Sequence, residues 1–187
     1  MTGIKANNEV IGLTPEAMAN SRTGVPYYNG ADSTCPATGN ATVVTTLLEL
    51  AKAAGRGTAV ATIARVTRAT PAATYAHICH RDGENTTANA VVPGGAGYNA
   101  ALGADSIDVV LGGESQHFLP KGAAAGSVRN DPRDLTVELK AKGFNYVTDL
   151  AGLSAVPAET TQFLGLFIKG PMNFDLDRDP SRETRLT

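Results

Sequence analysis

The fold class is decided by residues 58–81, which read TAVATIARVTRATPAATYAHICHR. The first part, residues 58–66, is short and rich in Val, Ile and Thr, which favours a buried strand. In the second part Pro71 suits the first helical position, where the N–H group that proline lacks would have no helical partner. A strand that leads directly into a helix is the unit from which α/β folds are built.

Upstream of this stretch, apolar residues follow the spacing i, i+3, i+4, i+7, which predicts one face of a helix. These residues are Val44, Leu47, Leu48 and Ala51. Thr42 is a candidate N-cap for this helix, because its hydroxyl can accept an orphan backbone N–H. Gly55 is a candidate residue just beyond its last turn, because glycine adopts a positive φ without strain.

Downstream, strand-like and helix-like segments continue to alternate. Residues 107–111, 144–147 and 163–168 are strand candidates, and Leu135 and Leu139 suit a helix that ends at Gly143. Residues 83–104 are polar and glycine-rich and predict a loop around Pro93. The alternation predicts an α/β fold with a mainly parallel sheet flanked by helices.

We expect residues 1–187 to form a single domain with three regions. Residues 1–40 are rich in Gly, Asn, Pro, Ser and Thr, with a turn signal at residues 28–30, and predict an irregular surface stretch. Residues 41–174 form the α/β core. Residues 175–187 are charged and predict a mobile tail.

Composition excludes several classes of function. A hydrophobic content of 42% and a charged content of 18% indicate a globular chain. The formal net charge is -2 and lysine and arginine form no block, so we expect no nucleic-acid interface. No apolar run reaches the length of a membrane-spanning helix, and residues 1–5 carry no apolar core of a signal peptide.

Cys35 and Cys79 leave two alternatives open, two buried free thiols or one disulfide in an exported protein. The histidines His77, His80 and His117 are interpreted as structural, because a zinc site needs three or four converging ligands and no Cys/His/Asp spacing supplies them. The glycine clusters at residues 94–97 and 112–113 fit no phosphate-binding motif and are interpreted as turns.

Residues 67–81 resemble a motif of the alkaline phosphatase family, in which a Thr-Pro-Ala helix start leads to an arginine about three turns later. Four further segments resemble family motifs in the same order along the chain. They are residues 2–5 (Thr-Gly-Ile-Lys), 47–55, 109–113 and 164–167. Five matching segments in the same order indicate the family more specifically than any single segment does.

The resemblance implies roles for individual residues. Arg81 matches the arginine that binds the phosphate of a phosphate monoester, a role that suits the planar fork of donors on a guanidinium. Thr70 matches a threonine whose hydroxyl is a magnesium ligand. Two residues earlier the family has Asp or His beside the magnesium site, and this chain has Arg68, a cation that would repel Mg²⁺ unless its side chain turns away.

The family hydrolyses phosphomonoesters through a phosphoserine intermediate with the help of zinc and magnesium. The serine lies in an Asp-Ser-Ala segment upstream of the Thr-Gly-x-Lys motif, so it would precede Met1, and the zinc ligands would lie outside residues 1–187. The resemblance therefore implies a fragment that is inactive by itself. The alternatives are a non-catalytic anion-binding or phosphate-binding module and a purely structural α/β domain. Family members are exported, periplasmic or extracellular, and typically homodimers.

Overall fold

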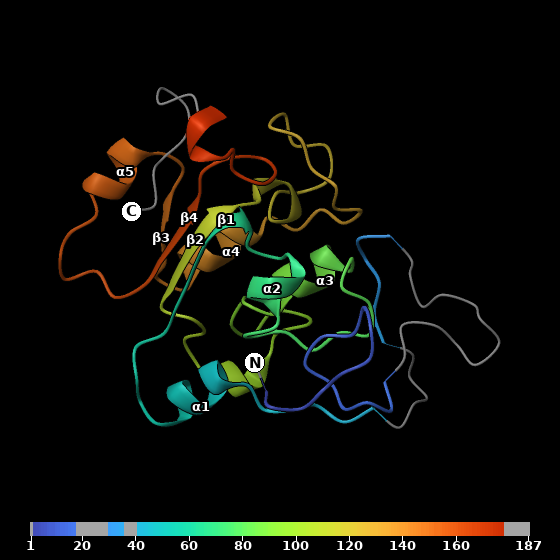
Figure 1. Cartoon of the computed structure of the whole chain (residues 1–187). Coiled ribbons are helices and arrows are strands. Elements are labelled where there is room, and N and C mark those ends of the chain that lie inside the picture. Colours follow the sequence, from blue (N-terminus) through green and yellow to red (C-terminus); the bar gives the residue numbers. More distant parts are fainter. Residues whose placement is uncertain (1, 18–29, 36–40, 178–187) are drawn as a thin grey trace.

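The computed structural model describes residues 2–17, 30–35 and 41–177, and its centre is a parallel sheet (Figure 1). The strands are β1 (Ala59–Arg65), β2 (Val109–Gly113), β3 (Asn145–Val147) and β4 (Phe163–Leu166). They are ordered β1-β2-β4-β3, and all neighbours pair in parallel. The predicted α/β class with a parallel sheet is therefore confirmed, and all four expected strands lie within two residues of their expected positions.

Short helices connect the strands. The α-helices are α1 (Leu47–Ala53), α2 (Ala69–Ala72), α3 (Glu84–Asn89), α4 (Leu135–Ala141) and α5 (Leu150–Ser154), and the 3-10 turns are η1 (Ala100–Leu102), η2 (Ser115–His117) and η3 (Asp175–Asp177). The helix expected around Leu135 and Leu139 is confirmed as α4, and Gly143 follows it with a φ of 96°. The loop expected over residues 83–104 contains α3 and η1, so that prediction was wrong in part.

Apolar side chains cover both faces of the sheet. On one face, residues of α2, α3 and α4 pack with strand residues such as Val60, Val110 and Leu164 in the main core. On the other face Val147, Phe167 and Met172 form a second cluster, against which Leu111 and the α5 residue Leu153 pack. Figure 1 shows α5 beside β3, α2 and α3 near the middle of the molecule below the sheet, and α1 at the bottom of the view.

The start of α1 differs from the expectation. Its N-cap is Thr46, four residues after Thr42. Thr46 and Glu49 form a capping box, in which each side chain accepts the backbone N–H of the other residue. Leu47, expected on the buried face, is 68% exposed, whereas the Glu49 carboxylate is buried. Gly55 does follow the helix with a φ of 66°, as expected.

The helix expected between Thr70 and Arg81 is much shorter than predicted. α2 ends at Ala72, its N-cap is Arg68 without a side-chain cap, and Pro71 is its third residue rather than its first. The helix cannot continue because Ile78 pairs with Ile11 through two backbone hydrogen bonds of 2.9 Å. Tertiary pairing therefore overrides the local helical pattern.

The residue pair Gly112 and Gly113 was expected to be a turn, but it forms the end of β2. Close packing explains why glycine is needed here. A Cβ on Gly112 would lie 2.8 Å from the Thr62 carbonyl oxygen, and a Cβ on Gly113 would collide with Gly170. The glycines allow β2 to approach its neighbours rather than to reverse direction.

The N-terminal segment is not confined to the surface, as was expected for residues 1–40. Val10, Ile11, Leu13 and Ala17 are buried. Cys35 and Cys79 form a disulfide with a Cα–Cα distance of 5.0 Å, which rules out the alternative of two free thiols. The turn expected at residues 28–30 and the tail beyond Asp177 fall largely or wholly outside the described residues.

None of the helices in the described part of the chain has the length and apolar character needed to cross a membrane.

Candidate functional site

Thr70 and Arg68 lie where the chain leaves the carboxyl end of β1. Thr70 is an exposed residue of α2, and its side chain does not cap that helix. The Arg68 side chain is 45% exposed, and its Nη1 lies 3.8 Å from Glu84 Oε1. The guanidinium that replaces the expected Asp or His thus has an acidic partner beside it.

Arg81 lies on the connection between α2 and α3 and is half-buried. Its backbone N–H donates to the Glu9 carbonyl oxygen at 2.7 Å, which ties it to the N-terminal segment. Its neighbours His80 and Asp82 lie with Glu9 in a group whose ligand atoms are within 4.8 Å of one another. All three residues are half-buried, and they form a polar surface group around Arg81.

A buried polar cluster joins the carboxyl ends of β1 and β2. We call Arg65, Thr67, Glu84, Glu114 and His117 the strand-end cluster. Arg65 ends β1, Glu114 directly follows β2, Glu84 begins α3 and His117 ends η2. Ligand sites in parallel α/β sheets lie outside the carboxyl ends of the strands, so this position suits a functional group.

Arg65 is the principal donor within the strand-end cluster. Its Nε and Nη2 donate to Glu84 Oε2 and Oε1 at 2.8 and 2.5 Å, and the same Nε lies 3.0 Å from Glu114 Oε2. The Thr67 hydroxyl lies 2.6 Å from Glu84 Oε2 and 3.1 Å from Glu114 Oε2. One hydroxyl proton can serve only one of these carboxylates.

The two carboxylates of the cluster differ in acidity. Burial works to raise the pKa of Glu84, but hydrogen bonds from Arg65 and Thr67 and nearby positive charge outweigh it and lower this pKa below its usual value. Burial and the negative charge of Glu84 raise the pKa of Glu114 to about 8. Burial is also the main reason that the pKa of His117 falls to about 4. Near neutral pH His117 is therefore uncharged.

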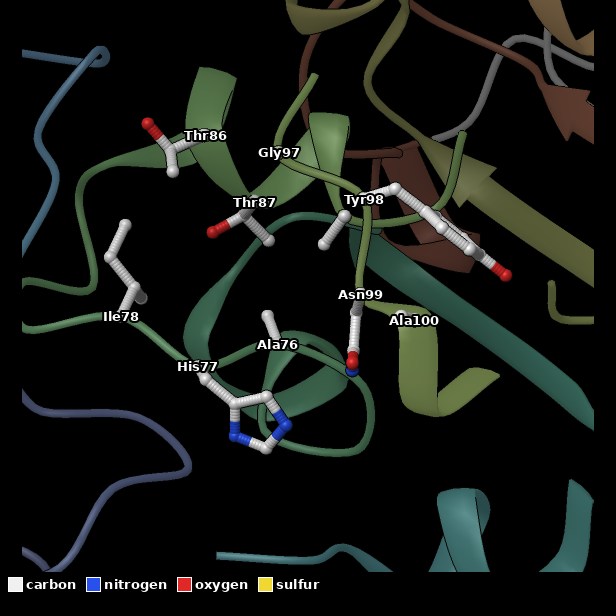
Figure 2. Close-up of a pocket in the computed structure, with 10 residues that line it drawn as sticks. Ala76, His77, Ile78, Thr86, Thr87, Gly97, Tyr98, Asn99 and Ala100 are labelled. Carbon is white, nitrogen blue, oxygen red and sulfur yellow. The ribbon is translucent and has the colours of Figure 1, made fainter. Parts of the chain in front are cut away.

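Both ring nitrogens of His77, by contrast, have partners that connect parts of the fold. Its Nδ1 lies 2.7 Å from the Gly12 carbonyl oxygen and its Nε2 lies 2.6 Å from Glu49 Oε1. Figure 2 shows His77 and Asn99 at one end of a small cavity and Thr87 across it. The cavity has a volume of about 220 Å³, and neither Thr70 nor Arg81 lines it.

Comparison with known proteins decides the family. The model of the family described as alkaline phosphatase matches residues 1–187. The chain belongs to the alkaline phosphatase family. The family resemblance drawn from the sequence motifs is therefore confirmed.

Individual alkaline phosphatases support this assignment. The chain is 33% identical to the repressible alkaline phosphatase of Saccharomyces cerevisiae over 144 residues, covering 72% of this chain and 24% of that protein. It is 34% identical to the alkaline phosphatase of Escherichia coli K12 over 166 residues, covering 80% of this chain and 33% of that protein. The chain thus spans about a quarter to a third of these two relatives.

Solved alkaline phosphatases share the fold. The enzyme from the Antarctic bacterium TAB5 superposes with a TM-score of 0.62 at 23% identity, covering 91% of this chain and 38% of that chain. The cold-active enzyme from a Shewanella species superposes with a TM-score of 0.54 at 28% identity, covering 87% of this chain and 32% of that chain. The parallel sheet described above is therefore part of the alkaline phosphatase fold.

Sequence reasoning missed the strand-end cluster altogether. Glu84 and Glu114 are 30 residues apart, and they meet because α3, which Glu84 begins, packs against η2 just beyond the carboxyl end of β2. The available signal was Glu114 itself, a charged residue placed directly after an apolar strand and two glycines. His117, interpreted from the sequence as structural, shares this cluster.

Proposed function

We propose that this chain is the part of an alkaline phosphatase that binds the phosphate of a phosphomonoester through Arg81. The match of the family model over residues 1–187, with Arg81 in its motif, carries this proposal. A guanidinium can donate two parallel N–H groups to two phosphate oxygens. The half-buried position of Arg81 supports the role, because its backbone is held at Glu9 while the side chain keeps access to a ligand.

The proposed reaction is hydrolysis of a phosphate monoester through a phosphoserine intermediate. Arg81 would hold the transferring phosphoryl group and stabilise the charge that develops on its oxygens. The printed sequence contains no Asp-Ser-Ala segment, so the nucleophile would come from residues other than those in 1–187. We therefore expect the chain by itself to be inactive.

Magnesium and zinc are the proposed cofactors of the whole enzyme, and when bound they supply Lewis-acid and charge-stabilising chemistry. Thr70 is the residue that would offer magnesium a hydroxyl oxygen. The fit is incomplete, because Mg²⁺ needs near-octahedral oxygen ligands and Arg68 stands two residues away. The contact of Arg68 with Glu84 supports a position in which its charge is drawn toward Glu84. We assign no zinc ligand of the family's active site within this chain.

We further propose an exported, periplasmic or extracellular enzyme that forms a homodimer. The Cys35–Cys79 disulfide supports export, because such bonds persist in oxidising compartments. The homodimer rests on the family resemblance alone.

A chimera tests the role of Arg81. Residues 1–187 replace the matching stretch of the Escherichia coli enzyme, and hydrolysis of p-nitrophenyl phosphate is measured at alkaline pH. We expect Arg81→Ala to lower kcat/KM by about 10²–10³-fold, the usual effect of removing a donor to transition-state charge. Arg56→Ala, at an exposed arginine, is the matched control and should leave kcat/KM unchanged.

Equal kcat/KM for the Arg81→Ala chimera and its parent would contradict the proposal. The isolated chain is assayed in parallel with added zinc and magnesium, and turnover clearly above buffer would refute its expected inactivity. Calorimetric titration of the isolated chain with inorganic phosphate addresses the alternative of a non-catalytic phosphate-binding module. Binding that Arg81→Ala abolishes, together with an inactive chimera, would favour that alternative.

A further inference from the structure

One oxygen of the strand-end cluster is buried without a hydrogen-bond partner. It is Oε1 of Glu114, a residue whose side chain is 0% exposed. Buried polar atoms normally have partners, because an unsatisfied one keeps the full cost of its desolvation. The nearest basic atom is His117 Nε2, at 3.2 Å.

The tautomer of His117 is set by Asn85. The Asn85 Nδ2 donates to Asp32 Oδ1 at 2.7 Å and to the Val128 carbonyl oxygen at 3.2 Å, so its Oδ1 faces His117 Nδ1, at 2.6 Å. An amide oxygen can only accept, and therefore His117 Nδ1 carries the proton. The Nε2 lone pair of the neutral ring then points toward the cluster.

The lone pairs of His117 Nε2 and Glu114 Oε1 thus face each other in a buried site. This arrangement is unfavourable unless a cation or a proton lies between them. The gap between the two atoms can hold a proton on Glu114 or, in its place, a metal ion. When Glu114 is ionised, the two buried carboxylates share Arg65 as their close cation, while Arg68 is half-exposed and 3.8 Å from Glu84. A divalent ion that displaces the proton would then balance the second carboxylate and separate the two lone pairs.

We propose that Glu84, Glu114 and His117 bind a divalent transition-metal ion, with Zn²⁺ as the ion to test. Their ligand atoms lie within 4.8 Å of one another, and His117 Nε2 is 3.2 Å from Glu114 Oε1 and 3.8 Å from Glu84 Oε2. Zinc bonds of about 2.0–2.1 Å place tetrahedral ligands about 3.3 Å apart. The two separations from His117 Nε2 lie within about 0.5 Å of this value.

The surroundings orient the ligands as those of metal sites do. The histidine donates its second ring nitrogen to Asn85, and Arg65 fixes the Glu84 carboxylate. Glu114 adopts a φ of 117°, where non-glycine residues are strained, and its N–H is held by the Ile168 carbonyl oxygen at 2.9 Å. Such strain at a buried side chain is typical of functional positions.

The proposed ion would link the ends of β1 and β2 to the start of α3, so its role is to stabilise the fold. The site uses neither Thr70 nor Arg81. The Thr67 hydroxyl lies 3.1 Å from Glu114 Oε2 and offers a further oxygen beside the proposed ion.

Refolding the whole chain tests the site directly. The chain, with its disulfide intact, is unfolded in guanidinium with a chelator and refolded with or without Zn²⁺. Metal content is then measured by mass spectrometry after gel filtration, and the melting temperature by circular dichroism. We expect about one zinc per chain and a melting temperature that rises with free zinc, since the ion binds the folded state. Absence of retained zinc together with a zinc-independent melting temperature would overturn the proposal.

Variants locate the ion. His117→Gln and Glu114→Gln should each weaken zinc binding at least about tenfold. Loss of a residue that only orients a ligand already weakens metal binding by about that factor. The Glu114→Gln amide can donate to His117 Nε2, so this variant should fold without zinc and separate loss of metal from loss of fold. His80→Gln, in the group around Arg81, is the control and should keep its zinc. Zinc retained by both cluster variants, or lost only in His80→Gln, would refute the assignment.

Discussion

Gly12 lies where the N-terminal segment passes the His77 ring. Its carbonyl oxygen contacts His77 Nδ1 at 2.7 Å and accepts from the Val44 N–H at 2.9 Å. Its φ of 64° favours glycine, and the space around it is closed as well. Conformation and packing therefore both restrict this single position.

The first prediction compares two glycines with nearly the same φ. A Cβ on Gly12 would lie 2.5 Å from His77 Nδ1 and closer still to Ala76, whereas a Cβ on Gly55 would have no atom within 4 Å. We expect Gly55→Ala to lower the free energy of unfolding by about 1–2 kcal/mol, the cost of left-handed backbone. Gly12→Ala should lower the free energy of unfolding by about 1–3 kcal/mol more than Gly55→Ala does, because its Cβ also overpacks the site. Urea denaturation measures both, and equal effects would contradict the packing argument.

At the scale of elements, the Glu49 carboxylate connects three separate parts of the chain. It accepts from the Thr46 N–H at the start of α1 and from the Asn99 side chain before η1, and its Oε1 lies 2.6 Å from His77 Nε2. Burial alone would raise the pKa of Glu49, but hydrogen bonds from Asn99, Thr46 and His77 outweigh it and lower this pKa below its usual value. The charged form of Glu49 is thus the one that holds these elements together.

The second prediction follows from the sign of this shift. Because the pKa of Glu49 is lower in the folded chain, its stabilising contribution is complete above the unfolded pKa of about 4.5 and is lost as pH falls through the folded value. The melting temperature should therefore fall below pH 4.5, and Glu49→Gln should be less stable near pH 6 with a weaker acid dependence. Glu159→Gln, at an exposed residue, should keep the parental acid dependence. An unchanged profile in Glu49→Gln would contradict the assignment.

At the scale of the whole molecule, the Cys35–Cys79 disulfide fastens the N-terminal segment to the α/β body across 44 residues. Cys79 packs with Val10, Leu13 and Ala17 in a cluster of its own. This cluster is small, so covalent closure of the loop contributes substantially to holding the segment in place. The same bond is the clearest structural support for the proposed export.

The third prediction concerns this bond. Replacing both cysteines with serine should lower the free energy of unfolding by about 2–4 kcal/mol, because the unfolded chain gains the entropy of an open loop. Adding a reductant to the parent chain should have a similar effect and none on the serine variant. Guanidinium denaturation with and without reductant provides the measurement, and a reductant effect of similar size in both proteins would disprove the explanation.

Much of this protein was predictable because it depends on local pattern or on motif order. The strands near residues 59–65, 109–113 and 163–166, α4 with Gly143 after it, and the parallel α/β class follow from residue types and spacing along short segments. The family followed from motifs in register over the chain, as the family match confirms. Such signals involve residues close in sequence, whose geometry the backbone itself restricts.

Tertiary structure alone decided the features that bring distant residues together. The strand order β1-β2-β4-β3, the pairing of Ile11 with Ile78 that ends α2 early, and the disulfide all depend on contacts between remote segments. The strand-end cluster is the clearest case, since Glu84, Glu114 and His117 come together only when α3 packs against η2 beside the carboxyl end of β2. No periodicity encodes such a meeting, because it is set by the packing of whole elements rather than by the conformation of any one of them.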